Sequence, residues 1–145
     1  MNVRHFFSDD EKRQIMEAIC AAELLTSGEI RVHIEESCPV GPLNRAAYWF
    51  AKLKMHKTRL RNGVLFYMAV KARQFAIIGD AGINARVAPD FWDGIRAVMA
   101  AHFGEGHVAH GLAEGIRMAG DCLKTYFPRS ADDINELPDE ISFNS

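Results

Sequence analysis

Residues 79–84, with the sequence GDAGIN, place a carboxylate at Asp80 and an amide at Asn84 in one short loop. Oxygen atoms of such side chains, together with backbone carbonyls, are the ligands that calcium and magnesium prefer. With Glu29 as a further oxygen ligand and Arg61 nearby, the loop would suit a divalent cation beside a phosphate, because both positive groups neutralise phosphoryl charge. The alternative interpretation is a glycine-rich turn closed by a surface ion pair between Arg61 and Asp80.

A β-hairpin must position this loop. Two apolar runs, residues 64–70 and 75–78, flank the polar residues 71–74, and this pattern is typical of a hairpin with a four-residue connection. The second strand ends directly before the loop. We therefore expect Asp80 to lie at the same end of the sheet as the start of the first hairpin strand.

A third strand is predicted at residues 29–35, where apolar and polar residues alternate strictly. We expect it to be half buried, with a polar face made by Glu29, Arg31, His33 and Glu35. A helix beginning at Pro42 follows, and a strand, a helix and a strand in this order favour a right-handed parallel crossover. The starts of both parallel strands, at Glu29 and Arg61, should then meet the loop that carries Asp80.

Three further helices complete the expected fold. Residues 8–11 form a capping box, Pro89 precedes a second helical pattern, and residues 107–123 show apolar residues at helical spacing. Gly111 and Gly115 lie one turn apart in that last helix, which indicates close packing against a neighbouring element. The fold class is α/β, a three-layer α/β/α sandwich with a small mixed sheet of three to four strands and about four helices.

The charge divides the chain into two parts. Residues 1–129 hold all 17 basic and 14 of the 19 acidic residues, a net charge of +3, whereas residues 130–145 hold five acids and no base. We interpret residues 1–129 as a single α/β domain and residues 130–145 as an acidic C-terminal extension. No basic run interleaved with aromatic residues is present, so the sequence predicts no nucleic-acid partner.

The chain carries no secretory signal pattern and no apolar run approaching the roughly 20 residues that span a bilayer. We therefore expect a cytoplasmic location without direct membrane insertion. The cysteines form no CxxC pair and suit a reducing compartment, so all three are predicted to be free thiols: Cys20, Cys38 and Cys122.

Other reactive side chains match no established motif. His102, His107 and His110 fit neither HExxH nor a zinc-finger spacing, and we interpret them as solvated residues at helix ends. Cys38 follows two glutamates that would raise its pKa, which disfavours a nucleophilic role. Phosphate-loop and dinucleotide fingerprints are absent, which disfavours a standard nucleotide enzyme.

The chain resembles the TPM-domain family, most closely its short bacterial members without membrane anchors. The resemblance rests on TSGEIRVHIE at residues 26–35, RNGVLFYMAV at 61–70, FAIIGDAGIN at 75–84, FW at 91–92, the glycine pattern at 111–120 and DDINELPDEISF at 132–143. It implies an α/β/α sandwich with a small mixed sheet. It also implies an acid phosphatase activity described for a thylakoid member, and the calcium binding that some members show near the loop matching residues 79–84.

Two functions follow as hypotheses. The first is a weak, divalent-cation-dependent phosphatase acting on phosphomonoesters, in which Asp80 and Asn84 hold calcium or magnesium, Glu29 assists and Arg61 orients the phosphate. The second is a non-catalytic adaptor or assembly module that binds a protein partner through its sheet edge or its acidic tail.

Overall fold

The computed structural model describes residues 2–130 and 136–144, and their strands form one mixed sheet with the order β3-β2-β1-β4. Strands β1 (Glu29–Glu35) and β2 (Gly63–Ala69) run parallel, and β3 (Gln74–Gly79) returns antiparallel to β2. The short β4 (Ser142–Asn144) pairs parallel to the end of β1. The predicted parallel crossover and the hairpin are both confirmed.

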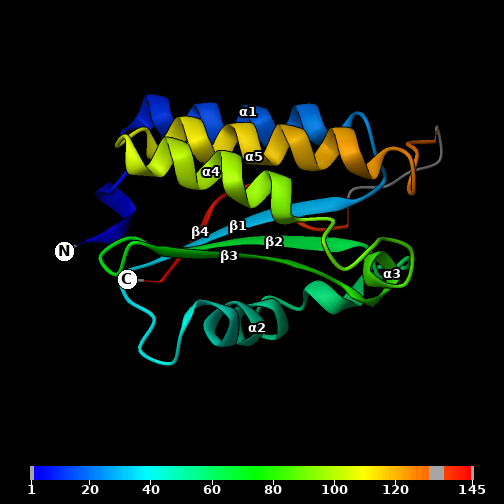
Figure 1. Ribbon diagram of the computed structural model, residues 1–145, viewed down its shortest axis with the longest axis horizontal. Helices are drawn as coiled ribbons and strands as arrows, with labels where there is room; N and C mark the ends of the chain where they lie inside the picture. The colour runs from blue at the N-terminus through cyan, green and yellow to red at the C-terminus, as the bar shows by residue number, and fades with distance from the viewer. Residues whose placement is uncertain (1, 131–135, 145) are drawn as a thin grey trace.

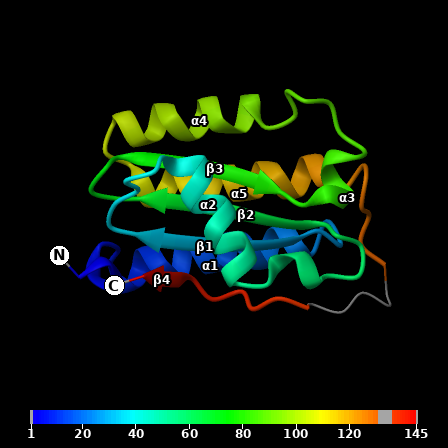
Figure 2. The same ribbon diagram turned by 90° about the horizontal axis from the view of Figure 1, so that it is seen from below.

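Helices cover both faces of the sheet (Figures 1 and 2). One face carries α1 (Asp9–Glu23), α4 (Asp93–Gly104) and α5 (Val108–Leu123), and the other carries α2 (Pro42–Lys52). The short helix α3 (Ala81–Asn84) lies beyond the end of β3, and two single 3-10 turns cover Val3–His5 and Met55–Lys57. The predicted three-layer α/β/α sandwich is therefore confirmed. Within the described residues, no helix has the length and apolar character that crossing a membrane requires.

Side chains of β2 alternate between two buried cores because successive residues of a strand point to opposite faces. Val64, Phe66 and Met68 pack in the larger core with α1 and α5, whereas Leu65 and Tyr67 belong to the smaller core beneath α2. Strand β2 is consequently buried along its whole length.

The expectation that β1 is half buried is wrong. Its polar face is also covered, and the exposed fractions are 4% for Glu29, 0% for His33 and 2% for Glu35. The cause is the packing of α2 and of residues 136–144 over that face, which buries carboxylates and an imidazole together with their partners.

Local signals for the helix starts are accurate in three of four cases, and α2 begins at Pro42 as predicted. The capping box is present, since Ser8 Oγ accepts from Glu11 N at 3.1 Å and Glu11 Oε1 accepts from Ser8 N at 2.9 Å. Helix α5 spans the predicted range to within one residue. Helix α4 begins at Asp93, four residues after Pro89, because residues 90–92 form turns before the regular helix.

Candidate cation and phosphate site at the rim of the sheet

The strand register brings the predicted site residues to one rim of the sheet. Glu29 is level with Gly63 of β2, and Asp80 N donates to the Gly63 carbonyl oxygen at 2.9 Å. Arg61 lies two residues before Gly63, so it enters the same rim from the chain segment ahead of β2. Alternation along the strands directs Glu29 and Asp80 to the same face of the sheet, the face under α2.

Arg61 and Asp80 form a two-pronged ion pair, which is the pair that the alternative interpretation of this turn predicted. Arg61 Nε lies 2.8 Å from Asp80 Oδ2, and Nη2 lies 2.8 Å from Oδ1. The Asp80 side chain is 5% exposed, whereas the Arg61 side chain is 50% exposed. The hydrogen bond from the guanidinium to Asp80 raises the pKa of Arg61 further. A buried carboxylate thus holds a solvent-facing guanidinium in one orientation, as bidentate pairs do.

Asp80 also starts the following helix, because its Oδ1 accepts from Ala81 N at 2.7 Å and so caps α3. The loop is docked tightly onto the segment before β2. Gly82 N donates to the Arg61 carbonyl oxygen at 2.8 Å, and a Cβ on Gly82 would lie 2.6 Å from that oxygen. Only glycine permits this approach, which fixes the spacing between the loop and Arg61.

The other two predicted ligands have different partners. Asn84 Nδ2 donates to the Gly79 carbonyl oxygen at 3.1 Å, so Oδ1 is the atom it can offer to a cation. Glu29 Oε1 accepts from Glu136 N at 2.5 Å and from Leu137 N at 2.6 Å, and burial raises the pKa of Glu29 to about 7. Glu29 therefore shares the rim with Asp80, but its carboxylate faces the C-terminal segment while Asp80 faces Arg61.

A second polar cluster, which the sequence did not predict, is centred on Glu35 at the other end of β1. Arg45 of α2 donates to both carboxylate oxygens at 2.9 and 2.7 Å, and Tyr67 Oη donates to Oε2. Trp49 Nε1 donates at 3.2 Å and Asn144 Nδ2 at 3.0 Å. Burial alone would raise the pKa of Glu35, but these hydrogen bonds outweigh it and lower the pKa to about 2.

His33 lies in the same cluster. Its ring stacks on Trp49 with centroids 3.9 Å apart, and its Nδ1 lies 2.9 Å from Ser142 Oγ. Burial lowers the pKa of His33 to about 4, so the ring is neutral at pH 7. The cluster joins β1 to α2 and β4, which is a structural role. Arg45 and Trp49 are one helical turn apart, so both can face the polar side of β1. This spacing was the sequence feature that could have predicted the cluster around Glu35.

Comparison with known proteins finds a family model that matches this chain. A family model described as the TPM domain matches residues 2–122. The chain belongs to the TPM-domain family. Among curated proteins, no relative of this TPM domain is found.

Solved structures support the assignment. The NMR structure of the BA42 protein from the psychrophilic bacterium Bizionia argentinensis is 46% identical, with a TM-score of 0.91 and coverage of 96% of each chain. The N-terminal domain of cg2496 from Corynebacterium glutamicum is 15% identical, with a TM-score of 0.66 and coverage of 81% of this chain and 74% of that chain. The N-terminal domain of a P. gingivalis protein is 19% identical, with a TM-score of 0.67 and coverage of 83% and 78%. The last two similarities show the fold alone.

Proposed function

We propose that this TPM domain is a divalent-cation-dependent phosphatase-like domain acting on phosphomonoesters at the Arg61–Asp80 rim. The observation that carries the proposal is the bidentate pair between a buried Asp80 and a half-exposed Arg61. Of the five guanidinium N–H groups, this pair uses two, so three remain to bind phosphate oxygens.

The donor set can also hold a hard cation. Asp80 Oδ1 accepts from Arg61 Nη2 and Ala81 N, which occupies both of its lone pairs, whereas Oδ2 accepts from Arg61 Nε and keeps one. That lone pair and Asn84 Oδ1 are the oxygen ligands for calcium or magnesium, and Glu29 would assist once its carboxylate leaves the C-terminal segment. When bound, the cation would activate a water for attack on phosphorus. Arg61 would orient the phosphate and neutralise its charge.

Turnover of an aryl phosphate tests the proposal. We expect calcium or magnesium to support turnover by the wild type, and we expect removal of the metal or the substitution Asp80→Ala to lower it by at least about 100-fold. Asp90→Ala, which removes an exposed carboxylate that is not one of the proposed ligands, is the matched control and should retain full activity. If the wild type, the Asp80→Ala variant and the metal-stripped protein are equally inactive while the fold is intact, the proposed phosphatase activity is excluded.

A second function, a non-catalytic adaptor, is favoured by the position of β3. Among the described strands, β3 pairs only with β2 and forms one edge of the sheet, where a partner strand can be added. The C-terminal segment already packs on β1, so the edge is the better surface for a partner than the tail.

Affinity capture distinguishes the adaptor from the enzyme. A protein partner that is captured by the wild type and lost with Ile78→Lys, while thermal unfolding shows that the variant is folded, would support binding at the β3 edge. If the wild type and the Ile78→Lys variant capture the partner equally, the β3 edge is excluded as the binding surface. If the wild type captures no protein above a blank resin, the adaptor function is contradicted.

A further inference from the structure

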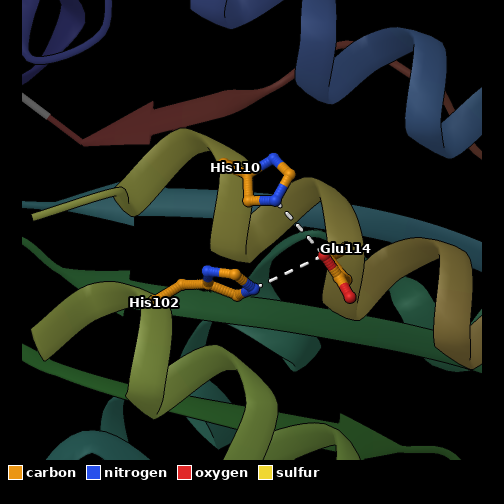
Figure 3. A group of neighbouring side chains, drawn as sticks. All are labelled: His102, His110 and Glu114. Atoms are coloured by element: carbon orange, nitrogen blue, oxygen red, sulfur yellow. Dashed lines mark ion pairs between the residues drawn. The ribbon is translucent and has the colours of Figure 1, made fainter. Parts of the chain in front are cut away.

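Three ionisable side chains meet on the outer surface of α4 and α5, away from the rim site. His110 and Glu114 lie one turn apart on α5, and His102 lies in the last turn of α4. Figure 3 shows both imidazole rings directed toward the Glu114 carboxylate. The interpretation of His102 and His110 as merely solvated helix-end residues therefore does not describe their arrangement, because the fold gathers them around one acid.

Small residues of α5 determine how closely the two helices approach. A Cβ on Gly111 would lie 2.8 Å from His102 Cβ and 2.9 Å from a ring carbon of Phe103. Contacts of that length do not occur, so glycine at this position lets the end of α4 lie directly against α5. The separation of His102 from His110 and Glu114 is thus set by backbone packing and does not depend on a bound ion.

The distances suit a tetrahedral metal ion. His102 Nε2 lies 3.4 Å and His110 Nε2 lies 3.3 Å from the same atom, Glu114 Oε2, and one ligand atom from each of the three residues lies within 4.8 Å of the other two. Ligands at about 2.0–2.1 Å from a tetrahedral zinc ion are separated from each other by roughly 3.3 Å. Both distances to Glu114 Oε2 already match this separation.

We propose that His102, His110 and Glu114 form a binding site for a divalent transition-metal ion of the zinc type. Two imidazole nitrogens with one carboxylate oxygen form a ligand set that zinc accepts and that calcium and magnesium, which require oxygen, do not favour. The side chains of His102, His110 and Glu114 are 26%, 52% and 41% exposed, so water can supply the fourth ligand. In the described residues, this is the one group of three or more histidine, cysteine or acidic side chains with metal-binding spacing.

The site is separate from the rim that carries Asp80. Phe103, next to His102, packs on Phe75 near the start of β3 with ring centroids 5.0 Å apart, whereas Asp80 follows the end of that strand. Asp80 lies five residue steps after Phe75, which corresponds to roughly 17 Å along an extended strand. Zinc bound at the helices would link the end of α4 to α5 and would not depend on the rim.

Calorimetric titration of the full, tag-free chain with zinc chloride tests the proposal. We expect one zinc ion per chain, and at least about tenfold weaker binding for each of the variants His102→Ala, His110→Ala and Glu114→Gln. His107→Ala is the matched control, because His107 is exposed, lies near His110 in sequence and is outside the group. It should bind zinc as the wild type does, and so should Asp80→Ala.

Two further measurements separate this site from adventitious binding. Zinc should raise the unfolding temperature of the wild type by several degrees and leave that of Glu114→Gln unchanged, since only a ligand of the folded state stabilises it. Cobalt should give the wild type, but not His110→Ala, the visible absorption of a four-coordinate ion. Absence of zinc binding by the wild type, or equal binding by the three site variants, would overturn the proposal.

Discussion

The buried carboxylate of Glu35 accepts five side-chain hydrogen bonds. It receives donors from Arg45, Tyr67, Trp49 and Asn144, which come from α2, β2 and β4. Loss of its charge would leave the Arg45 guanidinium, which is 23% exposed, without its partner. A single residue therefore couples three elements to β1.

Glu35→Gln should lower the free energy of unfolding by about 2–4 kcal/mol, because breaking a buried ion pair leaves the opposite charge uncompensated. Glu36→Gln is the matched control. Its ion pair with Lys71 spans 3.6 Å between side chains that are 39% and 69% exposed, so the change should be below about 0.5 kcal/mol. Urea denaturation measures both values, and equal losses would contradict the role given to Glu35.

Glu23 links stability to alkaline pH. Burial, followed by a hydrogen bond with Asp139, raises the pKa of Glu23 from 4.5 to about 9. The folded state thus holds a proton that the unfolded chain releases near pH 4.5, and its contribution to stability is lost as the pH rises through the folded pKa. The free energy of unfolding should fall between pH 7 and 9 by up to about 1.4 kcal/mol per pH unit.

The substitution Glu23→Gln should flatten this slope, since an amide remains neutral throughout. Glu17→Gln, which changes an exposed acid on the same helix, should leave the slope as it is in the wild type. Urea denaturation at several pH values between 7 and 9 checks both variants. A slope that persists in the Glu23→Gln variant would show that another group carries the pH dependence.

At the scale of elements, α5 is held between α1 and α4 through its glycines. A Cβ on Gly120 would lie 2.6 Å from Ala22 Cβ and 2.7 Å from Ala22 Cα, and a backbone atom cannot move aside as a flexible side chain does. Gly120→Ala should therefore force α1 and α5 apart and lower the free energy of unfolding by about 1–3 kcal/mol.

Gly94→Ala is the matched change in α4. Space around Gly94 is open, so a methyl group meets no neighbour, and the gain in helix propensity should stabilise the protein by roughly 0.5–1 kcal/mol. Thermal and urea unfolding of both variants give the comparison. Destabilisation by Gly94→Ala equal to that by Gly120→Ala would show that helix packing does not explain the glycines.

Local pattern was sufficient to predict strands β1, β2 and β3, their directions and the rim shared by Glu29, Arg61 and Asp80, but not β4. These features follow from apolar runs and turn residues that lie close together in the sequence. The burial of His33 and Glu35 could not be predicted in this way, because it depends on Ser142 and Asn144 returning across more than 100 residues to cover β1. The grouping of His102 with Glu114 likewise depends on contact between two helices.

At the scale of the whole molecule, the sheet separates two places where ions could act. The Asp80 loop lies at the rim beside α3, and the group formed by His102, His110 and Glu114 lies on the helical layer toward the opposite end of β3 (Figures 1 and 3). The rim offers side-chain oxygen atoms, whereas the helical group offers two imidazole nitrogens and one carboxylate oxygen, so we expect calcium or magnesium at the rim and zinc at the helices.

Titration of isotope-labelled protein with calcium and with magnesium, followed through backbone amide NMR shifts, tests cation binding at the rim formed by Glu29, Arg61 and residues 79–84. We expect saturable shift changes at residues 79–84, Arg61 and Glu29 in the wild type, and none in Asp80→Ala. Shifts that are absent from the rim, or that are confined to residues around His102 and His110, would contradict cation binding at the rim.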